Sequence, residues 1–492
     1  MLIVMKFGGT SVGSVAALQQ VVGIVQKARQ RGDEVVLVVS AMNGVTDLLL
    51  KGARQAEKGD VETARKGHQE MLARHSEVIE TMLAGSSHQA TVLAEINALL
   101  AEFDSLCHSI KVLGELTPRA LDVIAGMGER MSVRQVAAVL EANGIPATAI
   151  DATQLIVTDD RYGSASPLMP QTAERSQAVL LPLLAKGVVP VVTGFIGATE
   201  DGIPTTLGRG GSDYSGTILG RALGADEVWI WTDVNGVMTA DPRLVPNART
   251  IPRLSYVEVG EMAYFGAKVL QPQAIRPAKR SGMPVRILNT FDPNHPGTLI
   301  TKDADASGRT VKAITVIKGM SLIVVEGAGM LGVPGVAART FGAVARTGTS
   351  VLMISQSSSE QSICFVVPTS ESIGVLAALR AELALELERR DIENIEAQDH
   401  IVILAAVGAG MKGTPGIASR VFGALGRHQI NVIAIAQGSS EYNISVVVAQ
   451  SDADQAVRCL HDEFKLGEET SPSCAATSAG WRPVLNAWPT TI

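Results

Sequence analysis

The sequence lacks the features of a secreted or membrane-spanning protein. Only 4 of its 492 residues are cysteines, and no two of them form a Cys-x-x-Cys pair. No uninterrupted run of about 18 apolar residues, the length that crosses a bilayer as a helix, occurs in the chain. The apolar N-terminal run Met1–Phe7 is too short for a signal peptide and has no basic residues before it. We therefore expect a cytoplasmic protein with reduced thiols and no association with a membrane.

An excess of positive charge is also missing. Lys and Arg number 42 against 49 Asp and Glu, which gives a formal net charge of −7. We expect no nucleic-acid partner, because such partners are bound by a basic surface. Hydrophobic residues make up 46% and charged residues 18% of the chain, a composition typical of folded domains rather than of disorder. At this length, about three domains are expected.

The first part of the chain alternates short apolar runs with glycine-containing turns and helical patterns. Leu2–Phe7 and Val35–Ser40 have the composition of buried strands, and an amphipathic segment follows each of them. This alternation predicts an α/β fold, with an open, mostly parallel sheet between helical layers. Ligands of such sheets bind at the carboxyl ends of the strands.

Residues from about 47 to 112 interrupt the alternation. They contain no proline and carry apolar residues at helical spacing, which predicts a helical insertion beside the sheet. Four histidines in this region lack the spacing of metal ligands, so we expect them on the solvated surface: His68, His75, His88 and His108.

A lysine and a glycine-rich loop stand where the first predicted strand ends. Lys6 lies two residues before the loop 8–13, which leads into a helical pattern. Glycine amides and a lysine at the start of a helix suit a phosphate, although a tight turn beside a surface lysine has the same composition.

A second glycine-rich loop, Thr205–Gly216, also follows an apolar run and precedes a helical pattern. Arg209 lies between its glycines, and a guanidinium binds a carboxylate or a phosphate through two hydrogen bonds. Ser212 or Asp213 is expected to cap the helix that follows. The loop is thus a candidate anion site, with an ordinary tight turn as the alternative.

Further charged residues follow predicted strands or begin predicted helices. Glu129 falls in the first turn of a helix, where it either complements the helix dipole or binds a substrate ammonium. Thr232-Asp233, Asp241-Pro-Arg243 and Lys268 lie in or near predicted turns. Each is an ordinary surface residue when taken alone, and together they are candidates for a nucleotide site.

Five motifs in this order resemble those of the aspartate kinase family, and the likeness covers about residues 2–465. They are Lys6-Phe-Gly-Gly-Thr-Ser11, Gly208-Arg-Gly-Gly-Ser-Asp-Tyr214, Trp231-Thr-Asp233, Asp241-Pro-Arg243 and Phe265-Gly-Ala-Lys268. The resemblance implies an amino-acid-kinase domain over residues 1–300. It also implies Mg²⁺-dependent transfer of the γ-phosphoryl of ATP to the β-carboxylate of L-aspartate, the first step toward lysine, threonine and methionine.

The resemblance implies a role for each motif. Lys6 would steady the transferred phosphoryl, with Gly8 and Gly9 lining it. L-Aspartate would be bound by Lys6, Thr46, Glu129, Arg209 and Ser212. ATP would lie against Gly8, Gly9, Thr232, Asp233, Arg243, Lys268 and Val269. Two positions depart from the family pattern and receive no role: Met238, where relatives often have tyrosine, and Gln271, where histidine is common.

The C-terminal part repeats itself at one constant offset. Gly327-Ala-Gly-Met330 recurs as Gly408-Ala-Gly-Met411, and the same offset relates Gln356 to Gln437. This gapless match predicts a duplicated βαββαβ unit. Both copies contain the Gly-x-Gly-x-x-Gly pattern of dinucleotide sites. We expect no dinucleotide, because the following strands end in glutamine rather than an acid and each unit is too short.

The two copies resemble ACT domains, small amino-acid-sensing modules, over residues 315–395 and 400–466. This resemblance implies an amino-acid effector at the interfaces between units, and therefore a homodimer or a larger homo-oligomer. Threonine is favoured over lysine, because four positions resemble the threonine-binding residues of relatives: Ile354, Gln356, Ile435 and Gln437. The alternative is that both glutamines merely end strands.

Two other functions remain open, and the end of the chain adds one expectation. The protein is otherwise a glutamate or acetylglutamate kinase of the same fold, or a non-catalytic sensor whose kinase domain only supports the ACT pair. Bifunctional relatives continue into a homoserine dehydrogenase near residue 467, so we expect that activity to be absent. Residues 467–492 are small and polar, and we expect them to be disordered.

Overall fold

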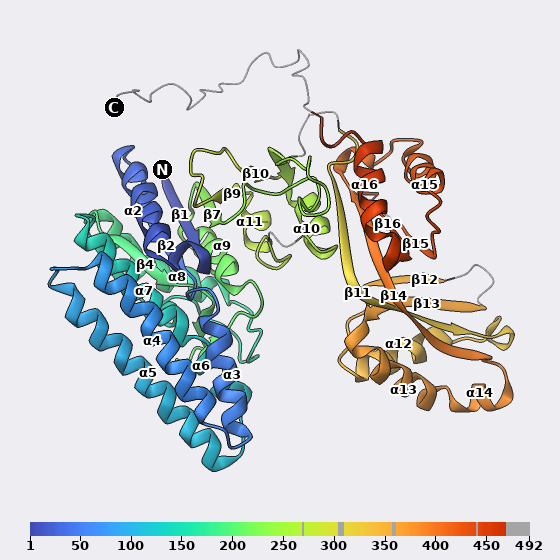
Figure 1. Cartoon of the computed structure of the whole chain (residues 1–492), viewed down its shortest axis with the longest axis horizontal. Helices are drawn as coiled ribbons and strands as arrows, with labels where there is room; N and C mark the ends of the chain where they lie inside the picture. The colour runs from blue at the N-terminus through green and yellow to red at the C-terminus, as the bar shows by residue number, and fades with distance from the viewer. Residues whose placement is uncertain (268–269, 304–308, 357–360, 439–440, 469–492) are drawn as a thin grey trace.

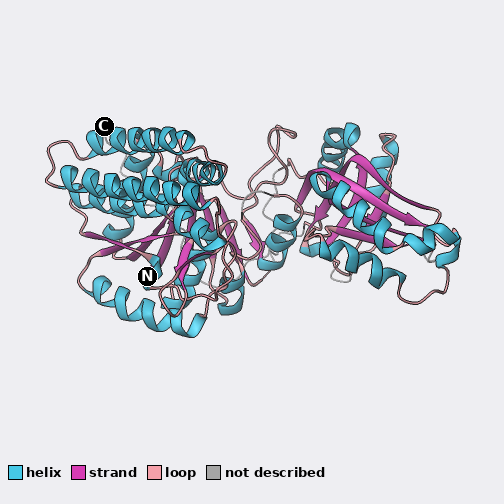
Figure 2. Cartoon of the chain, turned by 90° about the horizontal axis from the view of Figure 1, so that it is seen from below, coloured by secondary structure: helices cyan, strands magenta, loops and turns pink. Residues whose placement is uncertain are grey.

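The computed structural model describes residues 1–267, 270–303, 309–356, 361–438 and 441–468. An N-terminal lobe is built on an eight-stranded sheet and a C-terminal lobe on a six-stranded sheet (Figure 1). The two lobes lie side by side along the long axis of the molecule (Figure 2). Within these ranges, no helix has both the length and the apolar character needed to cross a bilayer.

The N-terminal sheet has the strand order β3-β4-β2-β1-β7-β9-β10-β8. In this spatial order, each strand from β3 through β4, β2, β1 and β7 to β9 is parallel to its neighbour. β10 is antiparallel to β9, and β8 is parallel to β10. The strands are β1 (Leu2–Phe7), β2 (Glu34–Val39), β3 (Ala147–Ile150), β4 (Val189–Thr193), β7 (Glu227–Thr232), β8 (Arg253–Ser255), β9 (Val285–Asn289) and β10 (Thr298–Thr301). The central strands are continuous apolar runs because helices cover both faces, and the predicted α/β fold is confirmed.

Helices form a layer on each face of this sheet. One face packs against α2 (Val15–Gln30) and α7 (Met127–Ala142), and the other against α8 (Met169–Ala185), α9 (Gly211–Leu223) and α11 (Arg276–Ser281). Four further helices extend the first layer outward: α3 (Val45–Glu57), α4 (Glu62–Met82), α5 (His88–Leu113) and α6 (Pro118–Ala125). In Figure 1 these helices form the outer edge of the N-terminal lobe.

The prediction of a solvated surface is wrong for His75. This side chain is fully buried, and its Nδ1 lies 2.8 Å from Oε1 of Gln135 on α7. Burial lowers the pKa of His75 to about 4, so the ring is neutral. The reason is its position on α4, since Met71 and Ile79, one turn away on either side, are also fully buried.

The C-terminal lobe contains the two repeated units in one antiparallel sheet, with the order β12-β13-β11-β14-β16-β15. The first unit comprises β11 (Ala313–Glu326), α12 (Val336–Arg346), β12 (Met353–Gln356), β13 (Ser362–Pro368), α13 (Ser372–Glu382) and α14 (Ala384–Arg389). The second comprises β14 (Asn394–Val407), α15 (Ile417–Arg427), β15 (Ala434–Ala436), β16 (Asn443–Ala449) and α16 (Ala453–Glu463).

The long strands β11 and β14 are shared between the units. The C-terminal part of β11, from Met320, pairs with β13 of its own unit, whereas its N-terminal part pairs with the end of β14. The sheet of the second unit is therefore completed by the N-terminal part of β11, the first strand of the first unit. This exchange fixes the two units to each other through backbone hydrogen bonds.

The glycines of the two Gly-x-Gly-x-x-Gly patterns have a packing role. A Cβ on Gly327 would lie 2.3 Å from the carbonyl oxygen of Asp391, and one on Gly408 would lie 2.3 Å from that of Thr310. Only glycine permits so close an approach of two backbones. The pattern thus follows from the contact between each loop and the segment that crosses it.

Candidate active site

The candidate site lies at the carboxyl edge of the N-terminal sheet, beside the central strand β1. The strand order changes direction here, with β2 on one side of β1 and β7 on the other, and ligands of open α/β sheets bind at such points. Part of the predicted loop 8–13 is helical, because Gly9–Val12 form the one-turn helix α1.

A cavity of about 250 Å³ opens at this edge. Its lining consists of Lys6, Ser40, Thr46, Glu129, Phe195, Gly208, Arg209, Gly210, Gly211, Ser212 and Asp213. All five side chains predicted to bind aspartate are among them, although they come from β1, α3, α7, α9 and the loop before α9. The structure therefore brings these five residues together, and Ser40 and Phe195 were missed by the sequence argument.

Lys6 forms an ion pair with a residue that the sequence argument gave another role. Its Nζ lies 2.5 Å from Oδ1 of Asp213, and both side chains are largely buried. The prediction that Ser212 or Asp213 caps α9 is wrong, because Gly210 is the N-cap and has a φ of 72°. The helix begins at Gly211, so Ser212 and Asp213 belong to its first turn and line the cavity.

Glu129 is the third residue of α7 and is almost completely buried. Its Oε2 has no hydrogen-bond partner among the described residues. Burial raises the pKa of this carboxyl to about 8, against the opposing effects of the Ala41 backbone N–H and the Lys6 ammonium. A buried carboxyl with a free oxygen on a cavity wall is suited to binding a cationic ligand group.

Arg209 is held in an exposed turn between two glycines in the left-handed conformation, Gly208 and Gly210. Its carbonyl accepts a hydrogen bond of 2.8 Å from Nε2 of Gln273. The described residues provide no carboxylate within ion-pair distance of its guanidinium. Gln271, to which we assigned no role, packs so closely that a Cβ on Gly210 would lie 2.3 Å from its Cγ.

Phe195 has a backbone conformation that is rare outside glycine, with a φ of 67°. Its N–H donates to Oγ of Ser215 on α9 at 3.0 Å. A Cβ on Gly211 would lie 2.6 Å from the Phe195 ring. Strained residues that the surrounding packing stabilises cluster at functional sites, and Phe195 lines this cavity.

None of the described residues assigned to ATP lines the cavity itself. The N–H of Gly8 donates to the carbonyl of Trp231 at 3.1 Å, which places the Lys6 loop beside the end of β7, where Thr232 and Asp233 lie. The guanidinium of Arg243 is exposed and paired with Asp241 at 2.6 Å. Lys268 and Val269 lie outside the described residues.

Gly9 packs against the loop after β2, since a Cβ on Gly9 would lie 2.7 Å from the carbonyl oxygen of Ala41.

No group of three or more His, Cys, Asp or Glu side chains that could hold a metal occurs in the ranges the structure describes. Mg²⁺ needs no such group when phosphate oxygens and water supply most of its ligands. Asp213 is the acidic side chain of the cavity next to Lys6.

Comparison with known families gives independent information about this site. The amino acid kinase family matches residues 1–289, and the ACT domain family matches residues 323–383 and 404–464. Aspartokinase 2 of Arabidopsis thaliana, a chloroplast protein, is 33% identical over 467 residues, which cover 94% of this chain and 84% of that protein. The chain belongs to the aspartokinase family.

Solved aspartokinases share the fold of this family member over nearly its whole length. E. coli aspartokinase III in complex with aspartate and ADP superimposes with a TM-score of 0.79 at 30% identity, covering 94% of this chain and 99% of that one. The Clostridium acetobutylicum aspartate kinase gives a TM-score of 0.76 at 28% identity, over 94% of this chain and 100% of that one.

Longer relatives are similar as well. The bifunctional aspartokinase/homoserine dehydrogenase 1 of Zea mays is 38% identical over 470 residues, which are 94% of this chain and 50% of that protein. This aspartokinase-family chain thus spans about half the length of the bifunctional relatives that it matches.

Proposed function

We propose that the chain is an aspartate kinase that transfers the γ-phosphoryl of ATP to the β-carboxylate of L-aspartate. The observation that carries the proposal is the cavity, which is lined by the buried Glu129 carboxyl, by Arg209 and by Lys6. An α-amino acid offers an ammonium to the first and an α-carboxylate to the second. The solved aspartokinase with aspartate and ADP, which shares this fold, supports the same substrate class.

The residue types are sufficient for phosphoryl transfer to a carboxylate. The β-carboxylate is already a nucleophile at neutral pH, so no general base is required. Its oxygen would attack the γ-phosphorus while the bond to the β-phosphate oxygen breaks, giving an acyl phosphate and ADP. Lys6 would neutralise the charge on the transferred phosphoryl, and Thr46 and Ser212 would help to orient the substrate.

ATP and Mg²⁺ are part of this proposal. The Lys6 ammonium and the first turns of α3 and α9 meet at the cavity, an arrangement that favours phosphate oxygens. Asp213, a carboxylate that lines the cavity, would help to hold Mg²⁺, which would supply positive charge against the phosphate groups. Thr232, Asp233, Arg243, Lys268 and Val269 remain our candidates for the nucleotide side.

A substrate panel tests this function. We expect ADP formation with L-aspartate to exceed that with L-glutamate in kcat/KM by about 10–200-fold, the effect of one methylene in a fitted site. N-Acetylglutamate should be inert, because its acylated nitrogen cannot pair with Glu129. ADP formation with glutamate or acetylglutamate, but not with aspartate, would favour the other carboxylate kinases. If none of these acids supports ADP formation, the result would favour a non-catalytic amino-acid sensor.

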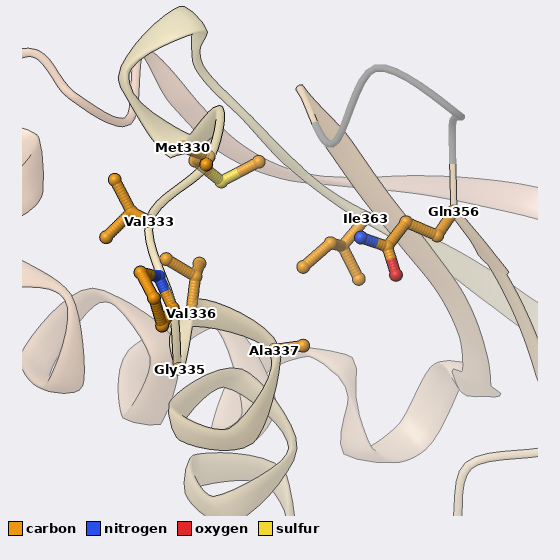
Figure 3. Close-up of a pocket in the computed structure, with 9 residues that line it drawn as sticks. Met330, Val333, Gly335, Val336, Ala337, Gln356 and Ile363 are labelled. Atoms are coloured by element: carbon orange, nitrogen blue, oxygen red, sulfur yellow. The ribbon is translucent and has the colours of Figure 1, made fainter.

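We also propose that an amino-acid effector binds the repeated units. A cavity of about 310 Å³ lies between the loop Met330–Ala337 and the strands that carry Gln356 and Ile363 (Figure 3). Its described lining is apolar except for the Gln356 amide and backbone groups, and it contains no acidic side chain for a lysine ammonium. A small, neutral amino acid such as threonine fits this chemistry better than lysine, the ligand of one solved aspartokinase III complex.

Replacing either glutamine with alanine is expected to weaken feedback inhibition more than turnover. Loss of one amide's hydrogen bonds should raise the inhibitory threonine concentration about tenfold for Gln356→Ala or Gln437→Ala, with kcat nearly unchanged. Titrating threonine and lysine against each variant measures the effect. Gln455→Ala, at an exposed position of α16, is the control. Inhibition by lysine alone would contradict the choice of effector.

We further propose a cytoplasmic homodimer or larger oligomer. The strands β12 and β15 are the two edges of the C-terminal sheet, and they expose Ile354 and Ile435. Edge strands with exposed apolar side chains are suited to pairing with a second copy of the chain. We place the kinase domain at residues 1–300 and the ACT units at 315–395 and 400–466. Residues 469–492 lie outside the described part of the chain.

A further inference from the structure

A buried carboxylate with no catalytic assignment lies behind the wall of the active-site cavity. Asp122 belongs to α6 and is only 3% exposed. In the described part of the chain no lysine, arginine or histidine forms an ion pair with it. Burying a carboxylate is costly unless hydrogen bonds compensate it, and such a group is a weak source of stability. The hydrogen bonds of Asp122 therefore decide what this side chain does.

Asp122 binds two segments that are distant in the sequence. Its Oδ2 accepts hydrogen bonds from the backbone N–H of Thr206 at 2.9 Å and of Gly163 at 2.9 Å. Its Oδ1 accepts from Oγ1 of Thr206 at 2.7 Å and from the same Gly163 N–H at 3.0 Å. Both oxygens are thus satisfied by neutral donors.

These two segments also contact each other. The N–H of Ala165 donates to the carbonyl of Thr206 at 2.8 Å. A Cβ on Gly208 would lie 3.1 Å from the carbonyl oxygen of Gly163. Asp122 therefore joins α6, the turn at Gly163 and the end of β6 (Pro204–Thr206) into one unit.

That unit connects the two sides of the substrate cavity. Thr206 lies just before the Gly208–Asp213 wall, which carries Arg209. In the other direction α6 ends at Ala125, and α7, which carries Glu129, begins at Met127. The position of Asp122 thus links the proposed carboxylate-binding guanidinium to the proposed ammonium-binding carboxyl.

We infer that Asp122 is a positioning residue that sets the distance between Arg209 and Glu129, and thereby the affinity for the amino-acid substrate. This inference rests on the proposed kinase function. An α-amino acid has a fixed distance between its ammonium and its α-carboxylate, so a shift of either wall weakens both contacts together. Thr232, Asp233 and Arg243, which we propose for the nucleotide side, belong to segments that Asp122 does not join, so ATP binding should depend less on Asp122 than aspartate binding does.

Kinetic analysis of Asp122→Asn tests the inference. The amide keeps the shape but replaces one acceptor oxygen with a donor that faces backbone N–H groups. We expect the KM for aspartate to rise about tenfold or more, and the KM for ATP to change by less than about twofold. Asp159→Asn is the matched control, because Oδ1 of Asp159 accepts a hydrogen bond from the Ser166 N–H in the same segment, whereas Thr206 donates to Asp122.

A second pair of variants keeps the test valid if Asp122→Asn does not fold. Thr206→Val removes only the hydroxyl donor and should raise the KM for aspartate. Thr206→Ser keeps the hydroxyl, so its KM for aspartate should stay close to that of the unsubstituted chain. Equal changes in the KM of both substrates, or unchanged KM values with only a lower Tm, would overturn the inference. Absence of aspartate-dependent turnover in the unsubstituted chain would instead overturn the proposed function, and this inference with it.

Discussion

Replacing Lys6 with methionine is expected to lower kcat by at least about a thousandfold, the usual effect of removing a cation that stabilises a transferred phosphoryl. Lys6 extends from the central strand into the cavity, and its only ion-pair partner among the described residues is Asp213. Methionine fills a similar volume, so the loss would report the missing charge rather than a collapsed cavity. Initial rates of ADP formation at saturating aspartate measure the effect.

The controls for Lys6→Met separate catalysis from folding. Lys51→Met, at an exposed position of α3, should leave kcat unchanged. Binding of the effector, followed by calorimetry, should persist in Lys6→Met because the C-terminal lobe is unaffected. Turnover of Lys6→Met close to that of the unsubstituted chain would remove Lys6 from the mechanism.

Replacing Glu129 with glutamine is expected to raise the KM for aspartate about 10- to 100-fold, because one charge-assisted hydrogen bond to the substrate ammonium is lost. The pH dependence should change as well. The free Glu129 carboxyl has a pKa of about 8, mainly because it is buried, so it is protonated at neutral pH. Aspartate binding would release this proton. The affinity of the unsubstituted chain should therefore weaken as the pH falls below about 8, and that of Glu129→Gln should not.

The same pKa predicts how the stability of the free protein changes with pH. The folded pKa lies above the ordinary value of 4.5, so the unfolded chain releases the proton first. The contribution of Glu129 to stability is therefore fully present below about pH 4.5 and is lost as the pH rises toward 8. We expect Glu129→Gln to gain Tm relative to the unsubstituted chain over this interval.

Thermal unfolding at several pH values, together with calorimetry in two buffers of different ionisation enthalpy, checks both results. Glu141→Gln is the matched control, because Glu141 lies at the other end of the same helix and is exposed. A pH profile of aspartate affinity that is identical in Glu129→Gln and the unsubstituted chain would contradict the assignment of the ammonium to Glu129.

The sheet and the main candidate residues could be predicted because their signals are local. Apolar runs such as Val35–Val39 predict buried parallel strands, and glycines near Lys6 or Arg209 predict anion-binding turns. The duplication of the C-terminal unit is visible as a constant offset. These features can be recognised from the residue types in short segments, without knowledge of how the segments pack.

Three errors or omissions have a non-local cause. His75 is buried because α4 packs its Met71–Ile79 face against the core, so its histidine hydrogen bonds to Gln135. Asp213 pairs with Lys6 because α9 begins two residues earlier than a cap at Ser212 would require. Phe195 lines the cavity and has a left-handed backbone conformation, which no sequence pattern predicts.

The sequence by itself determined the α/β class and the duplicated C-terminal unit, and it predicted five of the side chains that line the cavity. Periodicity, glycine positions and charge are properties of short segments, and they survive without knowledge of the fold. Only the tertiary structure decided that Glu129 is buried with a raised pKa, that Lys6 pairs with Asp213, and that the first strand of one repeat completes the sheet of the other. These facts depend on which distant segments pack against each other and so shield side chains from water. The packing of distant segments is a property of the assembled fold.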